Sequence, residues 1–391
     1  MIALLAFAVT LLVAVFLSEL ARRSVLSTAV LFLLAGFIAG QGGFGWISVR
    51  PTDAVVSEFS RLALFSVLFT DGMRVGVRDL VSAWHLPGRA LLLGFPLNLL
   101  FTAILAYWIV GLPWIEAFLL GAVLSPTDPV FAAAIVGREE IPDRIRHLLN
   151  VESGVNDGLA LPVVLVFLAA ASGTSVNGFL LIGEVVLGIC LGVTVPWLIL
   201  RIEKSRFFSV ATRYESFDAF AIALLLLALA SLTHANEFLA AFFGGVTITS
   251  AFPQVRDSFH QFGDQLTELL KLAALLVFGS LISPEFVREI RWLGYLLAGL
   301  ILLAVRPAAL SLALAGSSLP WREWMTVAWF GPRGFASVVF GLIILQSGIV
   351  RADEIFHLIA LVVVLSICAH SSTDVLLARR LHAQQPEKAA T

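Results

Sequence analysis

The chain has 391 residues, of which 59% are hydrophobic and 13% are charged, and its formal net charge is −2 at pH 7. Soluble globular proteins carry about 45–50% apolar and about 25% charged residues. The composition therefore excludes an ordinary soluble domain and predicts an all-α polytopic membrane protein. We expect membrane lipid around it and no nucleic-acid partner.

Helices that cross the hydrocarbon core of a bilayer need about 20 mostly apolar residues. Such segments follow one another along the whole chain with short connections, so we expect about 13 transmembrane helices. The predicted spans cover residues 2–20, 25–40, 57–71, 89–110, 114–136, 145–171, 177–200, 216–234, 236–252, 263–283, 292–316, 322–347 and 355–378. We expect the first span to be retained rather than cleaved, and residues 379–391 to form a short cytoplasmic tail.

Lysine and arginine are enriched in the cytoplasmic loops of membrane proteins. The loops after the odd-numbered spans, together with the C-terminal tail, contain 17 Lys and Arg residues, against 5 on the other side. The sequence therefore predicts an N-terminus outside the membrane and a cytoplasmic C-terminus. The basic residues inside predicted spans are Lys271, Arg306 and Arg333.

The fifth predicted span contains the sequence SPTDPV, in which Pro126 and Pro129 stand three residues apart. Each proline lacks a backbone N–H and clashes with the preceding turn, so the helix should open here. Open backbone at membrane depth is tolerated where it is buried in protein or lines a cavity. Asp128 lies in this break. The alternative is an ordinary proline kink with Asp128 as a cap.

The twelfth predicted span contains GPRG, in which Gly331, Pro332 and Gly334 surround Arg333. One interrupted span in each half indicates two inverted six-helix repeats, with the seventh span as a linker and a binding site near the midplane. Where the broken helices cross, Asp128 is expected to neutralise the positive N-terminal ends and Arg333 the negative C-terminal ends. The alternative is that Arg333 forms an ordinary buried ion pair.

The sixth predicted span contains charged residues in the sequence ESGVND, although a charge at the bilayer centre costs about 2.5 kcal/mol or more. On a helix, Glu152 and Asn156 share one face, while Ser153 and Asp157 share the adjacent face. Oxygen ligands of these types suit hard cations, and burial of a carboxylate favours its protonated form. A carboxylate that accepts either ion is the minimum equipment for exchanging them.

A buried Glu152 needs a partner, and Arg306 in the eleventh span is the best candidate. That pair would stay charged, which leaves Asp157 as the group that titrates. The alternative pairs Glu152 and Asp157 with unrelated basic residues. Glu268 and Lys271 stand three residues apart in the tenth span and are expected to pair with each other.

Three motifs in this order resemble those of the monovalent cation:proton antiporter superfamily, in its electroneutral sodium/proton exchanger branch of NhaP type. SPTDPV is similar to the unwound fifth helix of that family, ESGVND to the sixth-helix signature and GPRG to the crossing partner helix. The matching positions are Thr127, Asp128, Glu152, Ser153, Asn156, Asp157 and Arg333. The resemblance also implies the pairing of Glu152 with Arg306.

The resemblance implies an NhaA-like antiporter fold, in which a transport core moves against the dimerisation domain of a homodimer. The implied dimerisation domain covers residues 1–86 and 203–285, the core covers 87–172 and 286–378, and the linker helix covers 173–202. Some members also use an acid on the third span, which here is Asp71 in LFTDGMR. A simple ion pair of Asp71 with Arg74 is the alternative.

The implied activity is exchange of Na⁺ or Li⁺ for H⁺, one for one, in a bacterial inner membrane, with a role in pH homeostasis and without a cofactor. Asn156 stands where the electrogenic branch has a second Asp, so Asp157 alone would alternate between the two ions. The implied Na⁺ contacts are Asp157, Asp128, Ser153 and Thr127, and the wider site adds Asn156 and Asp71. A K⁺/H⁺ antiporter is the alternative. A remoter alternative is an intramembrane aspartyl hydrolase that uses Asp128 and Asp157.

Overall fold

A computed structural model describes residues 1–18, 27–51, 53–76, 86–128, 142–173, 178–203, 215–317 and 319–382. Within these ranges the regular structure is helical and contains no strand. The predicted all-α class is therefore confirmed. Every predicted span overlaps a helix in the described part of the chain.

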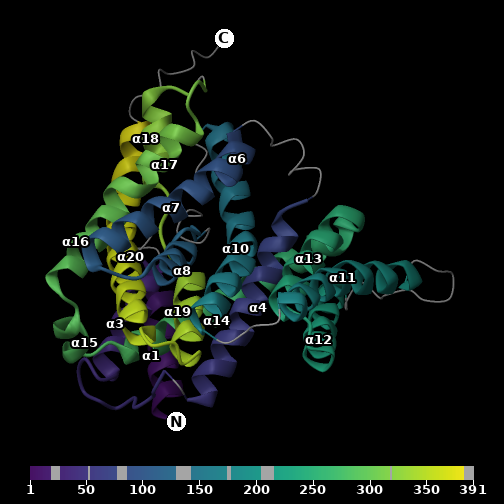
Figure 1. Cartoon of the computed structure of the whole chain (residues 1–391). Coiled ribbons are helices and arrows are strands. Elements are labelled where there is room, and N and C mark those ends of the chain that lie inside the picture. Colours follow the sequence, from purple (N-terminus) through teal and green to yellow (C-terminus); the bar gives the residue numbers. More distant parts are fainter. Residues whose placement is uncertain are drawn as a thin grey trace.

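One group of helices packs largely within itself; its members α11, α12 and α13 lie at the right of Figure 1, whereas α1 and α3 lie at the lower left. Its members are α1 (Ile2–Phe16), α3 (Thr28–Ala39), α4 (Ala54–Arg74), α11 (Gly178–Glu203), α12 (Glu215–Thr233), α13 (Glu237–Ala251) and α14 (Pro253–Leu281). Helix α4 packs on α13 and α14, α3 packs on α14, and α11 packs on α13.

A second group supplies most of the polar centre. It contains α6 (Leu86–Arg89), α7 (Phe95–Leu105), α8 (Trp114–Leu124), α10 (Asp143–Ala171), α15 (Pro284–Glu289), α16 (Trp292–Leu300), α17 (Arg306–Ala313), α18 (Trp321–Trp329), α19 (Phe335–Gln346) and α20 (Ala352–His382). Helix α8 packs on α7 and α10, while α20 packs on α16 and α19. The two groups meet where α4 contacts α10 and α19.

The fourth and eleventh predicted spans share one irregularity. A π-helical segment, Ala90–Gly94, joins α6 to α7 just before Pro96, and another, Ile301–Val305, joins α16 to α17 just before Pro307. Because proline cannot donate to the carbonyl four residues back, a widened turn before it relieves the clash. The same feature seven spans apart supports two related halves.

Both predicted breaks begin where the sequence places them. Helix α8 ends at Leu124, just before Pro126, and the twelfth span divides into α18 and α19 around the non-helical residues 330–334. The opening of the twelfth span is thus confirmed. Pro129 and the remainder of the fifth span, to residue 136, lie outside the described residues.

The described chain has five helices long and apolar enough to cross a membrane: Leu86–Val110, Arg144–Ala171, Gly178–Glu203, Trp292–Ala313 and Ala352–His370. Shorter apolar helices include α1, α3, α8, α12, α13 and α19. The predicted number of 13 spans is not established by these lengths. Helix α14 starts at Pro253, ten residues before the predicted span, because hydropathy marks only the apolar part of a longer helix.

Candidate functional site

The nine site residues proposed from the sequence are all buried, at 6% exposure or less. They come from α4, α10, α17 and the two broken segments, and they comprise Asp71, Thr127, Asp128, Glu152, Ser153, Asn156, Asp157, Arg306 and Arg333. Buried charges are costly unless they are paired and hydrogen-bonded. The partners of each side chain therefore separate structural charges from available ones.

Arg333 lies at the C-terminal end of α8. Its Nη1 donates to the carbonyl oxygens of Ser125 and Pro126, which continue the chain past the end of that helix. The Ser125 carbonyl has no helical donor, because residue 129 is a proline without an N–H, and carbonyls at this end carry the negative end of the helix dipole. The guanidinium therefore caps a helix that belongs to the other half of the chain.

Asp128 performs the opposite task at the start of α19. Its Oδ2 accepts a hydrogen bond of 2.9 Å from the backbone N–H of Phe335, the first residue of that helix. Its own N–H donates to the Pro332 carbonyl at 2.9 Å. A Cβ on Gly334 would stand 2.1 Å from Asp128 Oδ2, so only glycine permits this approach. The positions of Asp128 and Arg333 are those that the sequence predicts from helix polarity.

Side chains that the sequence does not single out also support the point where the two broken segments cross. Ser366 Oγ on α20 accepts from the Arg333 N–H at 2.7 Å, and Ser337 Oγ donates to the Val123 carbonyl at 2.8 Å. His370 is buried, and its Nε2 lies 3.0 Å from the Trp329 carbonyl at the end of α18. Serines inside apolar helices are common packing residues, so only tertiary contacts reveal these roles.

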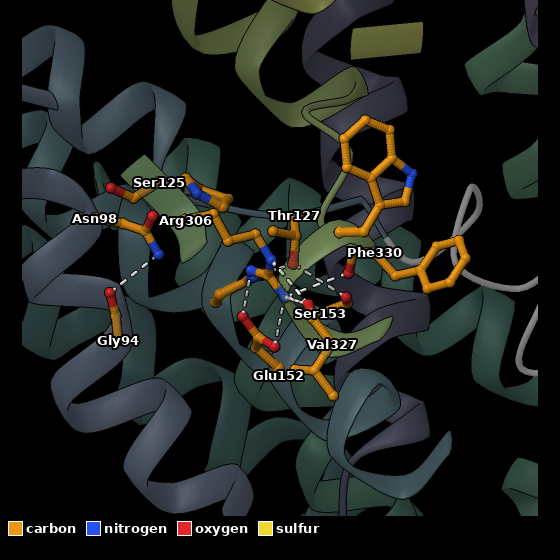
Figure 2. Close-up of polar contacts among 12 residues, drawn as sticks. Gly94, Asn98, Ser125, Thr127, Glu152, Ser153, Arg306, Val327 and Phe330 are labelled. Carbon is orange, nitrogen blue, oxygen red and sulfur yellow. Dashed lines mark hydrogen bonds and ion pairs between the residues drawn. The ribbon is translucent and has the colours of Figure 1, made fainter. Parts of the chain in front are cut away.

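Glu152 and Arg306 form a bidentate ion pair, which is the partnership that the sequence predicts. Arg306 donates from Nη1 to Oε1 at 2.7 Å and from Nη2 to Oε2 at 3.0 Å (Figure 2). Arg306 also donates to the carbonyls of Val327 and Phe330, at the C-terminal end of α18. Both oxygens of Glu152 and the guanidinium are therefore satisfied.

A second polar cluster joins the fifth-span break to α10. Asn156 Nδ2 donates to Thr127 Oγ1 at 2.7 Å, and Thr127 Oγ1 lies 3.1 Å from Ser153 Oγ (Figure 2 shows Thr127 beside Ser153). Asn156 Oδ1 is buried and has no hydrogen-bond partner among the described residues. The cluster thus presents two hydroxyl oxygens and one free amide oxygen.

Asp157 is 3% exposed, yet no described residue forms a hydrogen bond or an ion pair with its carboxylate. The charged groups close enough to act on it electrostatically are Asp71, Asp128 and Lys271. Among the buried carboxylates of the site, it is the one for which neither oxygen forms a hydrogen bond or an ion pair with a described residue. It is therefore available to a proton or a cation.

Asp71 comes from the last turn of α4 and is 1% exposed. Arg74 Nη1 contacts its Oδ1 at 3.2 Å, while Oδ2 is buried without a partner in the described structure. A Cβ on Gly154 of α10 would stand 2.8 Å from the Val75 side chain and 3.8 Å from the Asp71 carbonyl, so α4 and α10 lie close together here. Asp71 thus combines the ion pair expected as the alternative with a position near Asp157.

Lys271 departs from the sequence prediction. It was expected to pair with Glu268, but its ammonium forms no ion pair or hydrogen bond with any described residue. The pairing prediction is therefore wrong as a direct contact. Spacing along one helix allows such a pair but does not force it, and here α14 buries Lys271 to 4% exposure against neighbouring helices. In the sequence, Lys271 stands alone as a charged residue in the apolar run LLKLAALLVF, which is the pattern that could have indicated a buried lysine without a local partner.

Residues 7–379 match the model of the family described as "Sodium/hydrogen exchanger, transmembrane". The chain is similar to the sodium proton antiporter MjNhaP1 of Methanocaldococcus jannaschii, whose structure it matches with a TM-score of 0.80 at 20% identity, over 98% of each chain. The likeness shows a shared fold.

Curated relatives include the K⁺/H⁺ antiporter NhaP2 of Shewanella baltica, 26% identical over 96% of this chain and 66% of the relative. The Na⁺/H⁺ antiporter 2 of Zygosaccharomyces rouxii is 27% identical over 78% of this chain and 41% of the relative. The chain therefore spans 66% of the length of the Shewanella relative and 41% of the length of the Zygosaccharomyces relative. Since the family model covers nearly all of the described helices, the protein is an integral membrane protein and belongs to the transmembrane sodium/hydrogen exchanger family.

Proposed function

We propose that the chain is a secondary antiporter that exchanges a monovalent cation, Na⁺ or Li⁺, for H⁺ by alternating access. The observation that carries this proposal is the unsatisfied carboxylate of Asp157, buried beside the hydroxyl and amide oxygens of Thr127, Ser153 and Asn156. Oxygen ligands suit hard monovalent cations, and the same carboxylate binds a proton when no cation is present. Each ion therefore excludes the other.

One-for-one exchange follows from the number of carriers. Asn156 has an amide in place of an acid and releases no proton. Glu152 is held by two hydrogen bonds from Arg306, and Asp128 caps α19. With one carboxylate that takes either a proton or a cation, each cycle moves no net charge.

The transported cation is the point on which the relatives divide. The relative from Shewanella is named for K⁺, and that from Zygosaccharomyces is named for Na⁺. K⁺/H⁺ exchange at the same site is therefore the second candidate. An aspartyl hydrolase has no comparable support, because the relatives are named as antiporters and Asp128 is engaged with the Phe335 N–H.

Alternating access needs two bodies that move relative to each other. We assign residues 87–172 and 286–378 to the moving core and residues 1–86 and 203–285 to the dimerisation domain, with 173–202 as the linker. The packing supports this division, because α4 packs on α12, α13 and α14, and α14 packs on α3, whereas α8 packs on α7 and α10. Asp71 then faces the site from the stationary side, and Asp157 moves with the core.

The exposed apolar surface of the protein indicates what surrounds it. Helix α11 is apolar yet exposed along most of its length, for instance at Phe179 with 87% exposure, so lipid or a second copy should cover it. We propose a homodimer in a bacterial inner membrane, with the N-terminus outside, the C-terminus in the cytoplasm and no cofactor.

Proteoliposomes with an acidic interior test the proposal. Addition of Na⁺, Li⁺ or K⁺ outside should alkalinise the interior, and the initial rates at equal concentration rank the cations. Liposomes without protein and liposomes with an Asp157→Asn variant serve as controls. No alkalinisation with any of the three cations would remove the antiporter proposal.

A further inference from the structure

Lys271 is a buried charge that the proposed transport cycle does not use. It lies in the apolar second half of α14, is 4% exposed, and contacts no described acid directly. An unpaired cation inside a membrane protein is costly and typically marks an ion pathway. The structure therefore raises the question of what Lys271 offsets.

The position of Lys271 is fixed by polar contacts one turn away. Thr267 Oγ1 lies 2.8 Å from Thr70 Oγ1 and 3.1 Å from Ser66 Oγ, so these hydroxyls join α14 to α4. Thr70 directly precedes Asp71, and Lys271 follows Thr267 by one helical turn on the same face. The lysine therefore lies on the side of α14 that packs against α4 near the site.

The charged groups around Lys271 come from four segments of the chain. Helix α4 contributes Asp71 and Arg74, and α10 contributes Asp157. Helix α14 itself contributes Glu268 and Asp264, and the fifth-span break contributes Asp128 beyond them. Arg74 is already committed, because it contacts Asp71 Oδ1 at 3.2 Å and Asp264 Oδ1 at 2.9 Å.

We propose that Lys271 sets the affinity of the ion site: its fixed positive charge, held on α14, weakens the binding of any cation to Asp157 so that the bound ion is released on each half-cycle. Among the buried charged side chains of the described structure, Lys271 and Asp157 are the two that form neither a hydrogen bond nor an ion pair. The inference rests on the proposed exchange function and makes Lys271 the residue that sets the affinity of Asp157 for the transported ions.

The electrostatic argument predicts a particular pH signature. A proton and a monovalent cation carry the same charge, so a fixed charge nearby weakens both by a similar factor. When the two ions compete for one carboxylate, the apparent KM for the cation is constant at alkaline pH and rises in proportion to proton concentration at acidic pH. Removing the fixed charge should therefore lower KM on the alkaline plateau and leave the acidic limb unchanged.

The experiment measures apparent KM for the best cation between acidic and alkaline pH, in proteoliposomes with wild type, Lys271→Met and Lys271→Arg. For Lys271→Met we expect a KM about tenfold lower on the alkaline plateau, the size expected for one unit charge about 12 Å away at an effective dielectric constant of about 20. The pH at which KM starts to rise should move up by about 1 unit. Lys271→Arg keeps the charge and should follow the wild-type curve.

Two further variants separate charge from structure. Thr267→Val removes the hydroxyl contacts to α4 without changing charge, and it should leave the position of the bend in the KM profile unchanged. Lys271→Gln repeats the loss of charge with a polar side chain, in case the methionine variant does not purify as a folded protein.

The outcomes separate the role of Lys271 from the proposed exchange function. A plateau KM that does not fall in Lys271→Met or Lys271→Gln overturns the role of Lys271 while wild-type exchange stands. A fall by the same factor at every pH also overturns it, since that pattern would mean selective contact with the cation rather than a charge effect. An inactive wild type would overturn the proposed function itself.

Discussion

Two acids one and a half turns apart on α10 have opposite surroundings. Glu152 accepts both arms of Arg306, which in turn satisfies the carbonyls of Val327 and Phe330. Asp157 is equally buried but has no hydrogen bond or ion pair from any described residue. Glu152 therefore has a structural role, whereas the carboxylate of Asp157 can still bind an ion.

The difference shows that burial alone does not identify an ion carrier. A buried pair with every donor and acceptor satisfied gains nothing from an incoming ion, since the ion would have to displace an existing partner. A buried carboxylate without a partner gains from either a proton or a cation. The local network, rather than the residue type, therefore decides which acid can bind an ion.

The largest expected effect is at the open acid. Asp157→Asn keeps the size of the side chain but removes the proton and the charge, so exchange should be abolished while the protein stays folded. Proteoliposome exchange rates and the elution of the purified variant measure the two properties. A monodisperse variant with wild-type turnover would show that Asp157 is not the ion carrier and would remove the contrast with Glu152.

The satisfied acid should instead report on stability. Glu152→Gln or Arg306→Ala leaves one uncompensated buried charge, so each should lower the free energy of unfolding by about 3–5 kcal/mol. The double variant should cost less than the sum of the two single changes, because it removes both charges. A double-mutant cycle in detergent, followed by thermal or denaturant unfolding, measures the coupling. Strictly additive losses would show that the ion pair contributes no coupling.

These two acids also mark what the sequence could predict. The partner of Glu152 followed from charge balance, because a buried acid and a buried Arg306 each need an opposite charge. The breaks followed from Pro126 and from GPRG, whose backbone chemistry is local. The surroundings of Lys271 and the support of Arg333 by Ser366 did not follow, since they depend on how distant helices pack. Hydropathy and spacing carry no information about those contacts.

Asp128 should have an intermediate effect because it caps a helix end. Asp128→Asn retains an oxygen for the Phe335 N–H but loses the charge that offsets the N-terminal dipole of α19. We expect about 0.3–2 kcal/mol of lost stability together with reduced exchange. Unfolding and transport assays on the same preparation measure both. Unchanged transport with lowered stability would limit Asp128 to a capping role.

The smallest effect is expected at Asp71, which is half satisfied. Asp71→Asn loses the ion pair with a partly exposed Arg74, which retains Asp264. The negative charge of Asp71 acts on Asp157 as Lys271 does, with the opposite sign. Its removal should therefore raise the apparent KM by about tenfold, with exchange retained. Concentration dependence of exchange at alkaline pH measures it. Complete loss of exchange would place Asp71 beside Asp157 as a second essential carrier.

Proton release on cation binding tests the central claim most directly. Purified protein in weakly buffered detergent solution, at a pH where the wild-type KM profile shows proton competition, is titrated with the preferred cation while released protons are counted. One carboxylate that carries either ion predicts at most one proton per bound cation in the wild type. It also predicts release retained in Asp71→Asn and absent in Asp157→Asn. Release that persists in Asp157→Asn, or that approaches two protons per cation in the wild type, would contradict the single-carrier account.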